Sequence, residues 1–239
     1  MSGHSKWATI QTRKGAQDKK RANLFSKATK NIIIAAREGA DLETNFKLRL
    51  AVDKAKAVNV PKDNIERAIA KGSGAAGADL IEEVIYEGYG PSGIAILIEA
   101  ATDNRNRTSS EMKHILTKYG GSLGGPNSVQ WMFDHKGVIR IKQDQYEDKD
   151  MFLLELIDFG AEDVIEEEGG VTITTEIGQF VNLKKALDEK NIETEYSELE
   201  WIAKDEVAVS EEVQKKLAAL FDALEDDDDA VNYYSNAAI

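Results

Sequence analysis

The chain has 239 residues, of which 42% are hydrophobic and 31% charged, and its formal net charge is −13. It contains no cysteine, which excludes disulfides, zinc–thiolate sites, iron–sulfur clusters and a cysteine nucleophile, and which fits a reducing compartment. It has neither a run of eighteen apolar residues nor the apolar core of a signal peptide, so we expect a cytoplasmic protein without a membrane-spanning helix.

Charge is divided unevenly along the chain. Residues 1–72 carry a net charge of +9, residues 73–142 a net charge of −1, and residues 143–239 a net charge of −21. Such asymmetry is typical of separate domains with different partners. Because the acidic part would repel a polyanion, we expect nucleic acid to meet the first or second third of the chain and not the last.

The most basic stretch is residues 1–30, where eight lysines and arginines accompany one acidic residue, Asp18. Concentrated cations beside an aromatic ring suit a nucleic-acid-binding arm, because Lys and Arg release condensed counterions and the ring can stack on a base. A solvated charged face is the alternative interpretation. The residues that we expect to contact nucleic acid are Lys6, Trp7, Arg13, Lys14, Lys19, Lys20, Arg21, Lys27 and Lys30.

Helical spacing of apolar residues predicts three short helices that form a small bundle. The first runs from about residue 17 to a stop at residue 39, the second covers about 43–58, and the third covers 61–72. The third begins with a proline and ends with a glycine, as helices commonly do. The segment 72–77 lacks the Gly-Lys-Ser/Thr ending of a phosphate-binding loop, so we interpret it as a linker.

After this linker the apolar pattern becomes that of strands. The expected elements are strands over 81–87 and 94–101, a helix over 105–119, and a strand over 129–134. This strand–strand–helix–strand set does not make a complete sheet domain.

Residues 137–204 show the strand–helix–strand–strand–helix–strand order of a ferredoxin-like split fold. The expected strands are 138–142, 163–167, 171–176 and 194–203, and the expected helices are 148–159 and 179–190. A helix over 210–224 and a strand over 230–234 follow, and they would complete the middle segment.

We therefore predict an α+β protein in which an N-terminal three-helix domain precedes two ferredoxin-like α+β domains, the third inserted into the second. The predicted boundaries are 1–75 for the basic helical domain, 76–135 plus 205–239 for the second domain, and 136–204 for the inserted domain.

Motifs for catalysis or metal binding are sparse. His4, His114 and His135 lie in three different elements without the spacing of metal ligands, and no Gly-x-Ser-x-Gly elbow is present. The acidic run 225–229 lacks the spacing of a calcium-binding loop, so we interpret it as a solvated turn between helix and strand.

Residues 103–108, with the sequence DNRNRT, lie where a buried strand gives way to a helix. Unpaired backbone N–H groups at a helix start attract anions, so Arg105 and Arg107 are a secondary site for phosphate or the RNA backbone. Equally, Asp103 or Asn104 would cap the helix while the two arginines pair with neighbouring acids.

Three aromatic residues of the middle segment also allow two interpretations. They could form a base-stacking surface, or they could pack in the core, which strand positions favour. They are Tyr86, Tyr89 and Trp131.

Five segments in this order resemble the YebC/PmpR family of bacterial proteins, to which the mitochondrial translational activator of cytochrome oxidase also belongs. They are GHSKW at 3–7, PKDNIERAI at 61–69, YEGYGP at 86–91, TDNRNRT at 102–108 and LED at 224–226. The resemblance covers essentially the whole chain. The family often has a histidine before the Arg13-Lys14 pair where this chain has Thr12, a departure that bears only on details of the arm contacts.

The resemblance implies a helical domain followed by two α+β domains, and a non-enzymatic role linked to nucleic acid. Family members are usually described as DNA-binding transcriptional regulators, and others as ribosome-associated factors that help translation through stretches such as consecutive prolines. The chain lacks a clear base-reading helix-turn-helix, and cations on an arm suit backbone contact to DNA and to ribosomal RNA equally.

We accordingly predict a cytoplasmic, non-enzymatic regulator of gene expression whose partner is DNA or ribosomal RNA in the ribosome. We expect a protein partner at the acidic C-terminal domains, and no cofactor, metal, membrane or small-molecule substrate. Two alternative functions belong to other classes of protein. One is an enzyme in which Asp103, Arg105 and Arg107 bind a phosphorylated substrate, although no catalytic constellation supports it. The other is an adaptor whose arm binds an acidic protein.

Overall fold

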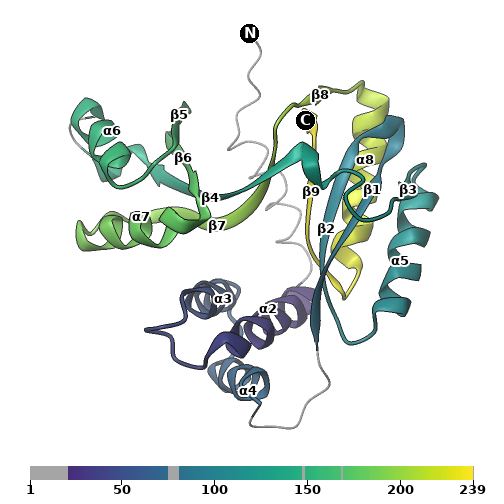
Figure 1. Ribbon diagram of the computed structural model, residues 1–239, viewed down its shortest axis with the longest axis horizontal. Coiled ribbons are helices and arrows are strands. Elements are labelled where there is room, and N and C mark those ends of the chain that lie inside the picture. Colours follow the sequence, from purple (N-terminus) through teal and green to yellow (C-terminus); the bar gives the residue numbers. More distant parts are fainter. Residues whose placement is uncertain (1–20, 75–80, 147–148, 168, 239) are drawn as a thin grey trace. The chain divides into compact units, whose positions relative to one another are not determined.

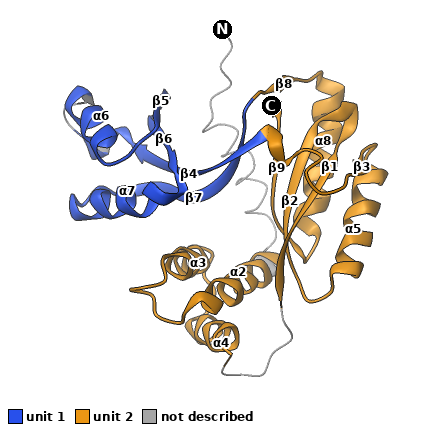
Figure 2. Cartoon of the chain, in the orientation of Figure 1, with its two compact units in different colours: residues 1–12, 133–204 blue, residues 13–132, 205–239 orange. Residues whose placement is uncertain are grey.

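The computed structural model describes residues 21–74, 81–146, 149–167 and 169–238, which divide between two compact units (Figures 1 and 2). We call the part within 133–204 the insert unit and the part within 21–132 and 205–238 the main unit. They are blue and orange in Figure 2. The chain leaves the main unit at residue 132 and returns to it at residue 205.

Three helices form the first layer of the main unit. They are α2 (Arg21–Ala35), extended by the 3-10 turn η1 (Ala36–Glu38), α3 (Phe46–Ala57) and α4 (Lys62–Gly72). Their inward residues follow the predicted helical spacing, because Ile32, Leu48 and Val52 are almost fully buried. These contacts confirm the expected three-helix N-terminal region.

The buried side chain of Asn45 joins the first two of these helices. Its oxygen accepts the backbone N–H of Leu48 at 3.0 Å and so caps the start of α3. Its amide donates to the carbonyls of Ala35 and Gly39, each at 2.7 Å. One side chain therefore satisfies backbone groups at both ends of the loop.

A four-stranded antiparallel sheet forms the second layer of the main unit, with strand order β3-β1-β2-β9. The strands are β1 (Glu82–Tyr89), β2 (Ala95–Thr102), β3 (Ser122–Leu123) and β9 (Ala230–Ser235). The 3-10 turn η2 (Pro91–Gly93) lies between β1 and β2, and η3 (Gln130–Met132) lies at the end of this part of the chain. The last long strand of the chain thus completes a sheet begun before the insert unit.

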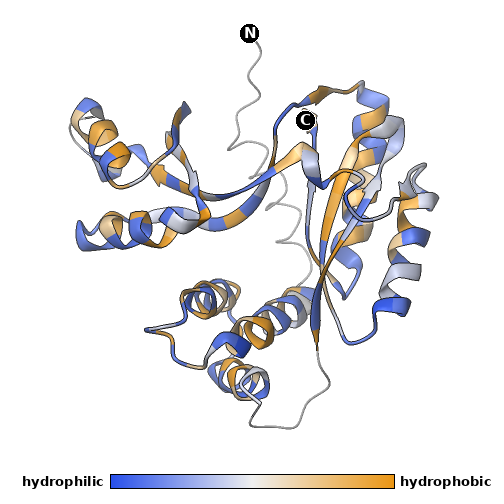
Figure 3. Ribbon diagram, viewed as in Figure 1, coloured by the Kyte–Doolittle hydropathy of each residue, from blue (hydrophilic) through white to orange (hydrophobic). Residues whose placement is uncertain are grey.

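Both faces of β2 are covered, which explains its nearly continuous apolar sequence (Figure 3). On one face, Ile96 and Ile98 pack with α5 (Arg105–Lys118) and α8 (Glu211–Asp226). On the other face, Ala101 packs into the core of the three-helix layer. The short strands β8 (Val207–Ala208) and β10 (Ala237–Ala238) pair in parallel.

The insert unit contains a second four-stranded antiparallel sheet with strand order β5-β6-β4-β7. Its strands are β4 (Phe133–Lys142), β5 (Asp163–Glu167), β6 (Gly170–Glu176) and β7 (Thr194–Ala203). Its helices are η4 (Gln143–Gln145), α6 (Lys149–Asp158) and α7 (Ile177–Glu189). The core includes Phe152 and Leu156 from α6 and Phe180 from α7.

The expectation of two separate strands over 129–134 and 138–142 is wrong. β4 runs unbroken from residue 133 to residue 142, and residues 130–132 form η3 instead. Gly137 lies in the middle of β4, where a Cβ atom would come within 2.3 Å of the Phe180 ring. The glycine therefore makes room for an aromatic ring and does not end the strand.

The other predicted helices and longer strands occur within a few residues of their expected bounds. The strands β3, β8 and β10 have two residues each, which is too short to show a period in the sequence. In the described part of the chain, no helix has both the length and the apolar character needed to cross a bilayer.

Candidate nucleic-acid interface

The structure describes only part of the predicted basic interface. Lys6, Trp7, Arg13, Lys14, Lys19 and Lys20 lie outside the described residues. Arg21 begins α2, and Lys27 and Lys30 follow on the same helix.

Lys27 is held against the C-terminal end of α8. Its Nζ donates to the carbonyl of Glu225 at 2.8 Å and to that of Leu224 at 3.3 Å. A cation at this place satisfies carbonyls that lack helical partners and complements the negative end of the helix dipole. Burial lowers the pKa of Lys27 to about 8, although nearby carboxylates oppose this shift. The ammonium therefore remains charged at neutral pH.

Lys30 reaches the turn that follows α8. Its Nζ donates to the backbone carbonyl of Asp228 and to Oδ1 of Asp229, both at 2.7 Å. The Lys30 and Asp229 side chains are only 18% and 11% exposed, so solvent screens this pair weakly. Both described lysines of the basic stretch thus make contacts within the main unit, and these contacts favour a structural role for them.

Asp229 lies at the centre of a cluster that connects four elements. Its Oδ2 lies 2.7 Å from Oγ1 of Thr108, 3.0 Å from Nη2 of Arg107 and 3.3 Å from Oγ1 of Thr102. Burial alone would raise the pKa of Asp229, but the hydrogen bonds from Lys30, Thr108 and Arg107 outweigh it and hold the pKa at about 2. We call these five residues the Asp229 cluster.

The sequence indicates that the acidic run 225–229 is a solvated turn, but only some of its side chains are exposed. Asp228 is exposed, as expected. The Asp227 carboxylate instead accepts the backbone N–H groups of Asp229 and Ala230 at 2.9 and 2.8 Å, which fixes the turn. Glu225 is buried and accepts the hydroxyl of Tyr233 at 2.9 Å.

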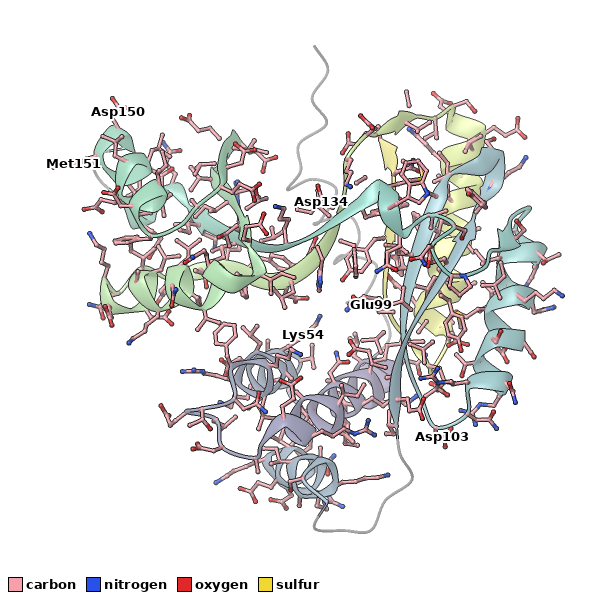
Figure 4. The ribbon with its side chains drawn as sticks, viewed as in Figure 1. Lys54, Glu99, Asp103, Asp134, Asp150 and Met151 are labelled. Carbon is pink, nitrogen blue, oxygen red and sulfur yellow. The ribbon has the colours of Figure 1, made fainter. Side chains whose placement is uncertain are left out.

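The turn between β2 and α5, where Figure 4 labels Asp103, carries the secondary site. The Asn104 side chain accepts the backbone N–H of Arg107 at 3.1 Å and so caps α5. Arg105 pairs with Glu82, and Arg107 pairs with Asp103 at 2.8 Å as well as with Asp229. The geometry thus favours the capping alternative at this turn, although both arginine side chains remain more than half exposed.

A groove of about 1010 Å³ lies beside the Asp229 cluster, between α2, α5 and α8. Its lining carries both signs of charge, with Lys30, Arg107 and Lys118 opposed by acids such as Asp222 and Asp226. A groove of mixed charge does not present the uniformly positive surface that a phosphate backbone prefers. Within the described ranges, no group of three or more His, Asp or Glu side chains is arranged to hold a metal ion.

The three aromatic residues have different environments. Tyr86 is buried at 9% exposure, and its hydroxyl donates to the carbonyl of Arg105 at 3.1 Å, so core packing is the correct interpretation there. Tyr89 is 37% exposed and Trp131 is 66% exposed. Core packing is therefore wrong for Trp131.

Sequence reasoning missed one residue of this region, Glu87. It is only 5% exposed, and its carboxylate accepts backbone N–H groups from the loop before Trp131. The available signal was an acidic side chain on an otherwise apolar strand, between Tyr86 and Gly88.

Comparison with known proteins gives full-length matches. A profile described as "TACO1/YebC protein N-terminal domain" matches residues 5–75, and one described as "TACO1/YebC second and third domain" matches residues 81–237. A Thermoanaerobacter pseudethanolicus protein is 47% identical over 100% of this chain and 98% of its own length. A Fusobacterium nucleatum protein is 49% identical over 99% of this chain and 95% of its own length. Both are named "Probable transcriptional regulatory protein".

The fold is also found in a solved structure. The crystal structure of the conserved hypothetical protein Aq1575 from Aquifex aeolicus aligns with a TM-score of 0.82 and 39% sequence identity. The alignment covers 93% of this chain and 92% of that protein. Profiles that match both parts of the chain, close relatives along its full length and a shared fold lead to one conclusion: the chain belongs to the TACO1/YebC family.

Proposed function

We propose that this protein is a cytoplasmic, non-enzymatic regulator of gene expression that binds nucleic acid through its basic N-terminal segment, as a DNA-binding transcriptional regulator. The observation that carries the proposal is the division of charge, with +9 on residues 1–72 and −21 on residues 143–239. Because Lys27 and Lys30 already bind the acidic end of α8 and the turn after it, repulsion by the acidic residues favours contact of a polyanion with the basic residues that precede them. The names of the relatives agree with this role.

The contacts of α2 reduce the number of residues proposed to bind nucleic acid. Because Lys27 and Lys30 are engaged with α8 and the turn after it, they serve to attach the helix. The proposed contact residues are those before them, namely Lys6, Trp7, Arg13, Lys14, Lys19, Lys20 and Arg21, with the exposed Arg105 and Arg107 as a secondary contact. No cofactor or small-molecule substrate is part of the proposal.

Salt-dependent binding tests this interface. Replacing Lys19, Lys20 and Arg21 together by Ala should weaken binding to duplex DNA across sequences. The slope of log affinity against log salt should fall by about 2 to 3 if three phosphate contacts are lost.

The matched control removes three positive charges elsewhere. Lys142, Lys185 and Lys216 are exposed lysines, and replacing them by Ala should leave both the affinity and the salt slope unchanged. Equal effects of the two triple variants, or no effect of either, would exclude the N-terminal segment as the interface.

A ribosome-associated translation factor that binds ribosomal RNA and relieves stalling at difficult stretches such as polyproline is the second candidate. The sequence has no clear base-reading helix-turn-helix, and backbone contact by the basic segment suits ribosomal RNA as well as DNA. Lysate sedimented on sucrose gradients at low and high salt separates the two. Salt-sensitive migration with ribosomes that the arm variant loses supports the translation factor, and recovery on DNA supports the transcriptional regulator.

We also propose three domains, comprising residues 1–75, residues 76–135 with 205–239, and residues 136–204 inserted into the second. The strand order β5-β6-β4-β7 with its two intervening helices supports a ferredoxin-like assignment for the inserted domain. Limited proteolysis that releases a stable fragment close to residues 136–204 would support these boundaries.

The protein partner expected at the acidic part has a candidate surface on α6. The exposed fractions of Met151, Leu154 and Ile157, which are spaced three residues apart, are 63%, 65% and 59%, and Figure 4 labels Met151 on this helix. Acids on the same helix, Asp150 and Asp158 among them, accompany these apolar residues. We propose that the partner combines apolar side chains with Lys and Arg.

A further inference from the structure

A loop of the main unit places an aromatic side chain in solvent. Trp131 lies in η3 and is 66% exposed, more than any other large hydrophobic residue of the described chain. A single exposed apolar residue is common and needs no explanation. The surroundings of Trp131 are what make it unusual.

The orientation of the ring is set by a shared acceptor. The indole Nε1–H of Trp131 donates to the backbone carbonyl of Ser128 at 3.2 Å, and the hydroxyl of Tyr89 donates to the same carbonyl at 3.1 Å. Because the polar groups of both side chains are used within the loop, the rings offer a ligand mainly their π surfaces.

The loop beneath the ring is clamped by Glu87 from β1. The two carboxylate oxygens of this buried residue accept the backbone N–H groups of Asn127, Val129 and Gln130 at 2.6, 2.8 and 2.7 Å. The Glu87 carbonyl accepts a fourth, from Gly124, at 2.7 Å. Charged acceptors make strong hydrogen bonds, so this segment is held in one conformation.

Glycines bring the loop close to the strand. A Cβ atom on Gly121 would lie 2.1 Å from the carbonyl oxygen of Tyr89, and one on Gly124 would lie 2.3 Å from Oγ of Ser128. A larger residue at Gly121 would require a shift of the backbone, and one at Gly124 would require the Ser128 side chain to move. The glycines and the Glu87 hydrogen bonds thus hold Trp131 and Tyr89 in fixed positions, as a preorganised binding surface requires.

The loop is also electrically neutral. Residues 120–132, with the sequence GGSLGGPNSVQWM, contain no Asp, Glu, Lys or Arg, although 31% of the chain is charged. A neutral aromatic surface suits the uncharged part of a nucleic acid, its bases, and not its phosphates. A ring can stack on any unpaired base because every base has a π face.

We propose that Trp131, with Tyr89 beside it, is a stacking platform for an unpaired base of single-stranded nucleic acid. The proposal rests on the nucleic-acid-binding function above and adds a second contact of different chemistry. The basic segment contacts phosphates, and the platform contacts bases. Since stacking releases no counterions, the platform contributes to affinity without contributing to the salt slope.

The test uses the full-length protein and short unstructured single strands of RNA and of DNA, with a blunt duplex of the same sequence. Trp131→Ala should weaken binding to the single strands on the order of five- to a hundredfold, with an unchanged salt slope and unchanged duplex binding. Trp131→Phe keeps a ring and should retain most of the affinity. Val181→Ala removes an exposed apolar side chain from α7 of the insert unit, outside the surfaces proposed above, and is the matched control.

The outcomes separate this proposal from the proposed function. If Trp131→Ala binds single strands as tightly as the unmodified protein while the arm variant loses salt-dependent binding, the platform is wrong and the nucleic-acid function stands. If the unmodified protein binds no nucleic acid, both are wrong. If Trp131→Ala loses only association with a protein, the surface is a protein contact and the platform is again wrong. Unchanged thermal unfolding of Trp131→Ala confirms that the fold is intact.

Discussion

Replacing Asp229 by Asn tests the cluster that joins α2 to the sheet layer of the main unit. The change preserves shape but removes the charge that attracts Lys30, Arg107 and Thr108. At 1.36 kcal/mol per pKa unit, lowering the pKa from 3.8 to about 2 corresponds to about 2 kcal/mol of stability at neutral pH. Lys30 also loses its carboxylate in a poorly solvated site, so we expect a total loss of about 2 to 4 kcal/mol.

Urea unfolding at pH 7, followed by circular dichroism, measures this loss. Amide exchange should show that α2 and β9 open more readily in the variant, because the cluster holds these elements together. Asp228→Asn is the matched control, since it makes the same change of charge one residue away on an exposed side chain. The control should stay within about 0.5 kcal/mol of the unmodified protein.

The Asp229 carboxylate also makes the stability of the fold depend on pH. Its folded pKa lies below its unfolded value, so the unfolded chain binds more protons at acid pH. The stability from Asp229 is therefore complete above about pH 4 and is lost as pH falls toward 2, and Asp229→Asn should lack this component. Equal stabilities of Asp229→Asn and Asp228→Asn at neutral pH, or equal acid profiles of Asp229→Asn and the unmodified protein, would show that the Asp229 carboxylate does not stabilise the fold.

Three further predictions concern the loop before Trp131 and the helix α6. Glu87→Gln places an amide donor against backbone donors, so it should cost about 2 kcal/mol and speed exchange of the three amides that Glu87 accepts. Gly121→Ala should lower the free energy of unfolding in urea by about 1 to 3 kcal/mol, because its Cβ would meet a backbone carbonyl. Gly125→Ala should lower it little, because no atom lies near the position of its Cβ, and equal losses for the two variants would contradict the close approach at Gly121. Leu154→Ala should change the free energy of unfolding by less than about 0.5 kcal/mol, whereas Leu156→Ala should lower it by about 2 to 5 kcal/mol, because only Leu156 is buried. A larger loss for Leu154→Ala than for Leu156→Ala would contradict the burial of this face of α6.

Local features of the sequence were enough to locate most helices. α4 begins one residue after Pro61 and ends at Gly72, as its terminal residues indicate, and α8 begins after Ser210, whose hydroxyl accepts the N–H of Val213. Helix ends depend on contacts between residues three or four apart, so a single sequence contains the necessary information.

Glycines show where local reasoning fails. Gly137 lies inside β4 because Phe180, more than forty residues later, occupies the space beside it. Gly72 does end α4, but it is also required by packing, since a Cβ atom there would lie 2.3 Å from the carbonyl oxygen of Ile33. A sequence does not show whether a glycine permits a turn or the close approach of another segment.

By itself, the sequence determined the α+β composition, the three N-terminal helices and the concentration of positive charge at one end, because periodicity and charge are local properties. The roles of individual side chains, in contrast, depend on the tertiary fold. Lys30 contacts an acid 199 residues away, and Tyr86 is buried while Trp131 is exposed. Burial and ion pairing depend on which distant segments meet, and no spacing along one chain specifies that.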